Sequence, residues 1–461
     1  MQNFTFANIV FTENRSGSDL IITMDDSQVP AALRQLDSDA SAWLLSEPTP
    51  TLVVAPKADK SPFERLTQAR KWLALLADAN PGKVTIAGND DDWAEALVVA
   101  LLARQARLPN FKKKAPAPAA LKEIALDGVS VDSARLLAEA QGNALVRFLS
   151  AMPASELTPA SYRTIVEALA REHNWQLDIF DQTRLDGLGA GAFLAVSRGS
   201  DNDQAAIVRL RLNANKGSKK VALVGKGLCF DTGGYNLKTS HMFGMHGDMG
   251  GSAVALGTLL TLTLMNSDLE VDCYLALAEN HIGPKAYKPN DLVRALNGTT
   301  IEVVDTDAEG RMVLADTLTL ASREKPALVM DYATLTGSCI RAIGTAQSGV
   351  FTNRDEWREA LIASGRQSGE RVWPFPLDAD YDDNIRSEVA DIQQCNPGAS
   401  CDHIDAARFL SRFVEEGVPW VHVDLSAAEH KGGLGAVATD LTGFGVRFSI
   451  ALLTGDYLSL K

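Results

Sequence analysis

The second half of the chain alternates short apolar, β-branched segments with helical segments, and this alternation restricts its possible folds more than any other feature. We expect strands at 205–212, 220–225, 270–277, 300–304, 327–332 and 420–424, with helices between most of them. Strands joined by helical crossovers pair in parallel, and a parallel sheet carries helices on both faces. Ligands of such sheets collect at the carboxyl ends of the strands, so functional residues are expected in the loops that follow them.

The first 130 residues alternate in the same way on a smaller scale. Strands are expected at 51–56 and 83–88, and helices at 61–79 and 91–108. A Lys-, Pro- and Ala-rich stretch at 109–123 is typical of a surface crossing or a domain boundary. An amphipathic pattern then predicts a long helix that ends near Met152 and Pro153.

These patterns predict an α/β protein with two domains. The prediction is a small N-terminal α/β domain over 1–130, with an oligomeric or regulatory role, and a connecting helix over 131–152. A larger C-terminal α/β domain over 153–461 is expected to hold the functional site on a mainly parallel central sheet. At 461 residues the chain is long enough for this division.

Composition narrows the location and the partners. With 46% hydrophobic and 22% charged residues, the chain reads as a soluble globular protein. The net charge of −14 argues against general binding to nucleic acid, and the basic triplet at 112–114 is interpreted as a solvated face. The five cysteines have no CxxC spacing, the first 20 residues show no signal peptide, and the apolar stretch 250–265 is too short for a membrane span. We therefore expect a cytoplasmic protein that does not enter a membrane.

Acidic and basic side chains gather after the expected strands. Four carboxylates belong to loops that can face one crevice: Asp231, Asp248, Asp307 and Glu309. Lys226 and Lys238 lie on the same loop as the first of them. Four carboxylates carry a charge of about −4, and like charges at close range raise one another's pKa unless cations intervene. Two divalent metal ions would neutralise them, and oxygen-rich ligation suits Zn²⁺, Mn²⁺ or Mg²⁺.

A calcium loop is the alternative interpretation of the densest acidic stretch, "DTDAEGRMVLAD". Counted from Asp305, the residues Asp307, Glu309, Gly310 and Asp316 fall at the ligand and glycine positions of an EF-hand loop. The flanks disagree with this interpretation. "TTIEVV" before Asp305 is β-branched and predicts a strand, whereas an EF-hand needs a helix there.

The combination of three motifs resembles a known family. "VGKGLCFDTGG", "DTDAEGRMVLADTL" and "ATLTG" are similar to motifs of the leucyl aminopeptidase family, which are hexameric exopeptidases with two metal ions. The resemblance spans roughly residues 145–455. It implies a homo-hexamer that removes the N-terminal residue of peptides with a free N-terminus. The cofactors it implies are two divalent ions per subunit, Zn²⁺ or Mn²⁺, together with bicarbonate.

The resemblance also assigns roles to individual residues. It implies five metal ligands: Lys226, Asp231, Asp248, Asp307 and Glu309. Asp231 and Glu309 would bridge the two ions, and a water between the ions would attack the peptide carbonyl. Lys238 would polarise that carbonyl, and Arg311 would hold a bicarbonate ion that acts as general base. As a ligand Lys226 must be neutral, so its pKa must fall far below the usual ~10.4.

A pocket for the first side chain of the substrate follows from the same resemblance. Its implied lining residues are Met245, Thr334, Leu335, Gly337, Ser426 and Glu429. Met245 and the small loop residues suit an aliphatic side chain, so Leu and Met are the expected preferences. Glu429 stands where the family often has an apolar residue, and at the pocket it would favour Lys or Arg over acidic residues.

This chain departs from the family pattern at several positions. Thr232 and Asn236 replace serines, and Asp305 replaces the asparagine that opens the acidic motif. The segment 238–248 is one residue shorter than usual. None of these changes removes an expected ligand. They bear on substrate geometry and metal preference.

Other polar residues have ordinary explanations. Cys395, Cys401 and His403 are interpreted as loop residues rather than as a zinc site, and His422 and Asp424 as structural groups on a buried strand. His241 and His246 are left open between loop residues and substrate contacts.

Two other classes of function stay open at this point. Some members of the family also bind DNA, so a regulatory protein on the same fold is one alternative. A metal-dependent amidase that acts on something other than peptides is another. The acidic balance and the complete set of expected ligands favour the aminopeptidase.

Overall fold

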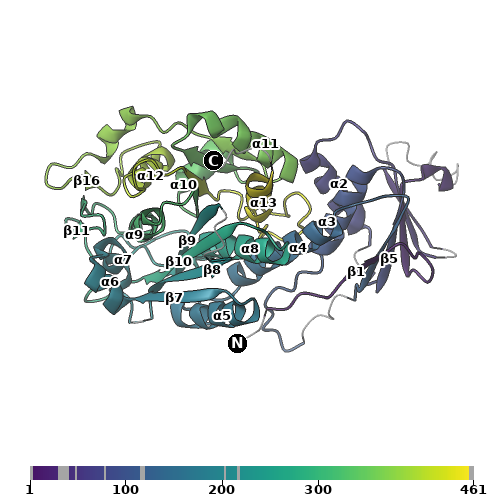
Figure 1. Ribbon diagram of the computed structural model, residues 1–461, viewed down its shortest axis with the longest axis horizontal. Helices are drawn as coiled ribbons and strands as arrows, with labels where there is room; N and C mark the ends of the chain where they lie inside the picture. Colours follow the sequence, from purple (N-terminus) through teal and green to yellow (C-terminus); the bar gives the residue numbers. More distant parts are fainter. Residues whose placement is uncertain are drawn as a thin grey trace.

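The computed structural model describes residues 4–29, 41–46, 49–76, 79–114, 120–201, 204–214 and 219–455. Figure 1 shows a smaller sheet with its helices at one end of the molecule and a larger sheet with its helices at the other. The long helix α4, Ser133–Ser150, lies near the place where the two parts meet (Figure 1). It is the helix predicted over 131–152, and the side chain of Asp132 caps its first turn.

The smaller sheet has six strands in the order β1-β6-β5-β2-β4-β3. All neighbours are parallel except β3 and β4. The strands are β1 Val10–Thr12, β2 Leu20–Thr23, β3 Ala42–Leu45, β4 Thr51–Val54, β5 Lys83–Ala87 and β6 Glu123–Asp127. A short 3-10 helix, η1 Asp26–Gln28, follows β2.

Two helices, α2 Pro62–Ala74 and α3 Asp91–Ala103, pack against this sheet. Ser61 and Glu64 form a reciprocal capping box at the start of α2. Both helices are shorter than the sequence predicted. Arg104 leaves α3 and donates to the carbonyls of Leu73 and Leu76, which satisfies the open end of α2. Residues 77–78 of the first predicted helix and residues 115–119 of the predicted boundary lie outside the described residues.

The larger sheet has eight strands in the order β15-β14-β17-β13-β9-β10-β8-β7. The four central strands, β17, β13, β9 and β10, are parallel to one another, whereas β8, β7 and β14 are joined in antiparallel fashion at the flanks. The strands are β7 Gln176–Asp181, β8 Ala206–Leu212, β9 Lys220–Asp231, β10 Glu270–Asn280, β13 Leu328–Ala333, β14 Ser348–Thr352, β15 Val372–Pro374 and β17 Trp420–Asp424. The prediction of an α/β fold with a mainly parallel central sheet is therefore confirmed.

Helices cover both faces of the larger sheet, as expected. Alternate residues of each central strand face opposite sides, so Leu223 and Val224 belong to different apolar clusters. One face packs against α4, α5 Pro159–Glu172, α8 Gly250–Leu264, α11 Arg358–Ser368 and α13 Val446–Thr454. The other packs against α6 Gln182–Leu188, α7 Gly191–Ser197, α9 Glu309–Arg323 and α12 Asp402–Ser411.

The remaining elements are short. They are η2 Met245–Gly247, α10 Gly337–Ile343, η3 Asp355–Trp357 and η4 Ala379–Ile385. A separate three-stranded sheet consists of β11 Leu292–Arg294, β12 Thr300–Glu302 and β16 Ile392–Gln393. The strand predicted at 300–304 is β12, so it exists but does not join the central sheet. Gln394 explains why this strand ends early, because its side chain binds the backbone amides of Val304 and Asp305.

The apolar stretch 250–265 forms α8, which is buried over its first 13 residues. It is a core helix, as the sequence indicated. Within the described ranges, no helix is both long and apolar enough to cross a membrane.

Candidate metal centre

Strand β9 brings Lys226 and Asp231 to the carboxyl edge of the larger sheet. Both side chains are buried. Asp231 Oδ1 accepts hydrogen bonds from the amide of Gly233 and from the side chain of Asn280, each at 2.8 Å. Gly233 and Gly234 have φ of 83° and 63°, values that favour glycine, and they turn the chain away from the sheet directly after Asp231. The carboxylate is thereby fixed in the crevice.

Two other elements contribute carboxylates to the same place. Asp248 lies between η2 and α8, and Glu309 is the first residue of α9. Lys226 Nζ donates to Asp248 Oδ1 at 2.8 Å and lies 2.9 Å from Glu309 Oε1. It also donates to the carbonyl of Thr334 at 3.1 Å. The amine of Lys226 thus links the loops that follow β13 and precede α8 with the start of α9.

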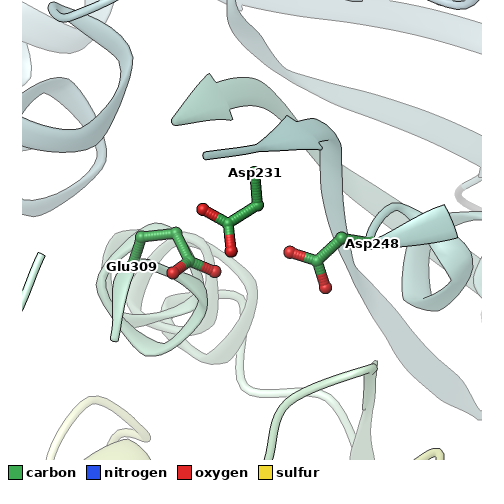
Figure 2. A group of neighbouring side chains, drawn as sticks. All are labelled: Asp231, Asp248 and Glu309. Atoms are coloured by element: carbon green, nitrogen blue, oxygen red, sulfur yellow. The ribbon is translucent and has the colours of Figure 1, made fainter. Parts of the chain in front are cut away.

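The three carboxylates of Asp231, Asp248 and Glu309 converge. One oxygen from each lies within 4.8 Å of the others, and Figure 2 shows the three groups pointing toward one another from a strand end, a loop and a helix. Asp248 Oδ2 and Glu309 Oε2 are buried and have no hydrogen-bond partner in the part of the chain that the structure describes. Buried polar atoms without a partner are rare, so this arrangement has the character of a cation site.

The electrostatics follow from burial and crowding. Burial raises the pKa of Asp248 to about 8 against the opposing charge of Lys226, and burial together with Asp231 raises the pKa of Glu309. For Lys226, burial lowers the pKa, but the surrounding carboxylates outweigh it and the net shift is upward. The lowered pKa expected for a ligand lysine is therefore not what the protein's own groups produce.

Lys238 and Asp307 form the outer side of the centre. Lys238 Nζ lies 2.8 Å from Asp231 Oδ2 and donates a short hydrogen bond to Asp307. Asp307 is half-buried, and burial raises its pKa to about 7 although Lys238 opposes the shift. Asp307 does not belong to the group of three converging carboxylates. Its connection to Asp231 runs through the ammonium of Lys238.

Arg311 lies two residues after Glu309 on the buried side of α9. Its guanidinium donates to Asp402 at 2.7 Å and to the carbonyl of Gln394 at 3.1 Å. Its Nε is buried and without a partner among the described residues. Between Glu309 and Arg311, a Cβ on Gly310 would lie 2.6 Å from the Lys226 amine, so the motif needs glycine there.

The expected pocket residues divide into two groups: those before Asp248 and after β13, and those after β17. Thr334 donates to Asp248 at 2.8 Å, and Met245 lies three residues before Asp248 at the start of η2. Leu335 follows Thr334 after β13 and its amide donates to Asp424 at 3.2 Å, whereas Gly337 is the first residue of α10. Ser426 and Glu429 follow β17. Ser426 is buried and donates to the carbonyl of Gln347, and the exposed Glu429 pairs with Leu441 in an isolated β-bridge.

Comparison with known proteins identifies the family. Residues 144–450 match the catalytic domain of the cytosol aminopeptidase family. The chain belongs to this family. The probable cytosol aminopeptidase of Parasynechococcus marenigrum (strain WH8102) is 39% identical over 389 residues, which cover 81% of this chain and 79% of that protein. That of Stutzerimonas stutzeri (strain A1501) is 39% identical over 375 residues, 78% and 75% of the two chains.

Solved structures resemble this chain over nearly its whole length. A leucyl aminopeptidase from Trypanosoma cruzi matches with a TM-score of 0.86 and 25% identity over 98% of each chain. The bottromycin maturation enzyme BotP matches with a TM-score of 0.85 and 30% identity over 96% of this chain and 100% of that one. BotP is similar also in its complex with Mn, at a TM-score of 0.84. The protein is a leucyl aminopeptidase-type hydrolase, and the expected family is confirmed.

In this cytosol aminopeptidase, several residues that support the site escaped the sequence analysis. Asn280 donates to Asp231 and also to the carbonyl of Thr306. Tyr287 donates to the same carbonyl at 2.9 Å. Thr306 in turn exchanges hydrogen bonds with Asn236. Asn280 ends β10 at the sheet edge where functional residues were expected, so its position was the available signal; Asn236 was noted only as a departure from the family.

The alternative metal interpretations fail on geometry. Asp316, the twelfth position of a calcium loop, accepts from the amides of Phe193 and Leu296 instead, at 2.8 and 2.7 Å. Glu309 already belongs to a helix, so the stretch does not wrap one ion. In the described ranges, Asp231, Asp248 and Glu309 are the only group of three or more such side chains whose ligand atoms converge, and it does not include Cys395, Cys401 or His403. His403 lies within α12 and is not the loop residue that was predicted.

Three other histidines considered in the sequence analysis also have definite places. His422 lies on the buried β17 and contacts Asp331 at 2.6 Å, and Asp424 holds the loop after β13, so both are structural as predicted. His241 is exposed with φ of 61°, and His246 is half-buried within η2.

Proposed function

We propose that this protein hydrolyses the bond after the first residue of peptides with a free α-amine, using two divalent metal ions. The ligands would be Lys226, Asp231, Asp248, Asp307 and Glu309. The observation that carries the proposal is the pair of buried carboxylate oxygens, Asp248 Oδ2 and Glu309 Oε2, that have no partner among the described residues. They belong to the converging group with Asp231, and hard oxygen ligands of this kind fit Mn²⁺ or Zn²⁺.

The upward pKa shift of Lys226 is compatible with a ligand role. It arises from the charges of Asp248, Glu309 and Asp231, the same groups that would bind the cations. Cations there would cancel those charges and disfavour an ammonium nearby, so metal binding would release the Lys226 proton. The bound ions would supply Lewis-acid activation of water and of the scissile carbonyl.

Two charged residues would serve catalysis beside the ligands. Lys238 is half-buried between Asp231 and Asp307, and its charge would stabilise the negative charge that develops on the substrate carbonyl oxygen. Arg311 would hold bicarbonate as the general base, and its unpartnered buried Nε supports this role. Its contacts with Asp402 and Gln394 would fix the guanidinium.

The substrate side chain would occupy a pocket formed by Met245, Thr334, Leu335, Gly337, Ser426 and Glu429. Thr334 donates to the proposed ligand Asp248, which couples the pocket wall to the ligand set, and Leu335 is held by the structural Asp424. The thioether of Met245 suits Leu and Met side chains. We further propose a cytoplasmic homo-hexamer, with residues 1–130, 131–152 and 153–461 as its N-terminal domain, connecting helix and catalytic domain; residues 456–461 lie outside the described part.

Hydrolysis of leucine p-nitroanilide tests the function directly. The enzyme is assayed after chelation and dialysis, and again after each of Zn²⁺, Mn²⁺, Co²⁺ and Mg²⁺ is added. We expect activity to disappear with chelation and to return with Mn²⁺ or Zn²⁺. The N-acetylated substrate is the matched control, and its hydrolysis at an equal rate would contradict the requirement for a free α-amine. Light scattering during gel filtration measures whether the protein is a hexamer.

A further inference from the structure

The loop over residues 428–442 follows β17 and contacts helices α2 and α4. Three residues before the loop, the amide of Leu425 donates to the carbonyl of Ala333, which precedes Thr334. Glu429 lies near this end. Further along, Gly432, Gly433 and Gly435 have positive φ values of 79°, 85° and 53°. Backbone hydrogen bonds join the two arms of the loop near its base, from the amide of His430 to the carbonyl of Asp440 and from the amide of Thr442 to the carbonyl of Ala428. The glycine-rich far turn lies beyond these bonds, so its position depends also on contacts with other elements.

Arg70 holds the far turn of the 428–442 loop from helix α2. Its Nη1 donates to the carbonyl of Gly432 at 2.7 Å and to that of Val437 at 3.0 Å. The fit is close, because a Cβ on Gly433 would lie 2.3 Å from Arg70 Nη1. No carboxylate of the described chain forms an ion pair with Arg70, so its charge is directed at backbone carbonyls of the loop.

Helix α4 holds the same loop at a second place. Arg147 donates through Nε and Nη2 to Thr439 Oγ1, at 3.2 and 2.9 Å, and through Nη1 to the carbonyl of Ala103 at the end of α3. Asn143 donates to the carbonyls of Thr442 and Gly443. Arg147 is 3% exposed, and burial lowers its pKa to about 10. A buried guanidinium without a carboxylate is costly, so its retention calls for a specific task.

Apolar packing alone does not hold the 428–442 loop in place. A cavity separates part of the loop from helices α2, α3 and α4, and its lining includes Leu66, Val99, Leu136, Leu434 and Val437. Where side chains leave a cavity, the dispersion contacts across it are missing. Ala436 of the loop is buried in the apolar cluster of the N-terminal part, and the hydrogen bonds of Arg70, Arg147 and Asn143 add polar links to helices α2 and α4 (Figure 1 shows both helices on this side of the molecule).

We infer that Arg70 and Arg147 are positioning residues that hold the 428–442 loop so that Glu429 stands at the substrate pocket. The N-terminal part of the chain thereby contributes to the choice of the substrate's first side chain. This inference rests on the proposed function, which places Glu429 in that pocket. The Glu429 carboxylate disfavours Leu relative to Arg substrates. A loosened loop would withdraw this carboxylate and so raise the preference for Leu.

The test compares Arg70→Ala and Arg70→Lys with Arg65→Ala. Arg65 is on the same helix but pairs with Asp92 at 2.9 Å, outside the loop. The measured quantity is the ratio of kcat/KM for leucine and arginine p-nitroanilides. We expect Arg70→Ala to raise the Leu-over-Arg ratio about fivefold, a change within the net worth of one or two hydrogen bonds. Arg70→Lys, which keeps the charge but not both bonds, should raise it less, and Arg65→Ala should leave it unchanged.

A second measurement separates positioning from general damage. Hydrogen exchange of the amides of 430–441 should become faster in Arg70→Ala, and the double variant with Glu429→Leu should show no further change in the ratio than Glu429→Leu alone. A purely structural role would lower kcat for both substrates and leave the ratio unchanged, which would overturn the inference. If the wild type is active and Arg70→Ala leaves the Leu-over-Arg ratio unchanged, this inference alone is rejected. A wild type that is inactive on every aminoacyl substrate rejects the proposed function as well.

Discussion

Two regions of this molecule bury acidic side chains, and they satisfy them differently. At the junction of the two parts, Glu139 is buried and accepts hydrogen bonds from Arg135 at 3.0 Å and from Arg447 at 2.5 Å, one on each oxygen. In the metal centre, Asp248 and Glu309 each keep one buried oxygen without a partner among the described residues. The buried carboxylate thus has a hydrogen-bond partner on each oxygen in one region, whereas in the other region one oxygen of each carboxylate lacks a partner within the described ranges.

The difference separates stability from function. A carboxylate whose bonds are all made inside the protein contributes to folding, and its loss leaves its partners unsatisfied. A buried carboxylate with an open oxygen adds little to folding, and its arrangement is explained by a ligand. Substitutions in the metal centre should therefore affect activity most, and substitutions at the junction should affect stability most.

The largest expected effect is on activity, from Glu309→Ala. The substitution removes a carboxylate proposed to bridge both ions, so kcat should fall by at least ~10³, in the range seen for major transition-state groups. Metal content measured by mass spectrometry should fall too. The melting temperature without metal should not drop, because one of three crowded carboxylates is gone. Near-normal turnover in this variant would refute the assignment of two metal ions.

The two lysines of the centre give the second prediction. Lys238→Ala should keep both ions and lose kcat by about 10²–10³, because its charge acts where negative charge develops. Lys226→Ala should instead weaken the binding of one ion, since its amine lies between Asp248 and Glu309. Titration of the dialysed variants with Mn²⁺ measures this contrast. Equal metal affinity, with a difference only in KM, would show the two roles to be wrongly assigned.

At the junction, Glu139→Ala should lower stability rather than activity. Arg135 and Arg447 would each lose a buried partner but keep Glu95, at 2.7 and 3.6 Å. We expect a loss of about 2–3 kcal/mol in the free energy of unfolding, below the usual cost of breaking a buried pair. Urea denaturation measures it, and kcat on leucine p-nitroanilide should change little. A stable variant with low activity would remove the distinction between the two regions.

Glu370, also at the junction, should make stability depend on pH. Its carboxylate accepts from the amides of Gly445 and Phe448, and burial raises its pKa to about 7. Because the folded-state pKa lies above the ordinary value, the stability it adds is complete below about pH 4.5 and is lost as pH rises through 7. Relative to Glu370→Gln, the wild type should lose on the order of 2 kcal/mol between pH 5 and 8. Melting temperatures of both across this range test the prediction, and parallel curves would contradict it.

The metal centre could be predicted from the sequence to the extent that local order determines it. Parallel strands end at one edge, so Asp231 at the end of β9 and Glu309 at the start of α9 were expected to meet. Lys226 was placed on a loop, but β9 continues to Asp231 and holds it inside the strand. Periodicity indicates where a strand begins better than where it ends, because apolar residues continue through the buried edge.

Other features depend on contacts that sequence order does not reveal. β8 was predicted as a strand, but its antiparallel pairing with β10 depends on the path of the connection rather than on its residues. β12 was predicted as a strand, but its partners β11 and β16 have only three and two residues, too few for a periodic signal, and were not predicted. Arg70 meets Gly432 across 362 positions of sequence. The role of Asn280 follows only from its two acceptors, Asp231 and the carbonyl of Thr306.

The smallest expected effect concerns substrate specificity. Glu429 is exposed, unlike the carboxylates of either region, so solvent screens its charge. If it lines the proposed pocket with Met245, leucine and methionine substrates are accepted, acidic ones are poor, and arginine gains from the carboxylate. Glu429→Leu should then raise Leu over Arg in kcat/KM by on the order of 1–2 kcal/mol, since a partly screened charge discriminates modestly. Glu416→Leu, at an exposed turn before β17, is the matched control and should leave the ratio as it is. An unchanged ratio in Glu429→Leu would place this carboxylate outside the pocket, and the specificity would then have to come from Met245 and the loop of Thr334 alone.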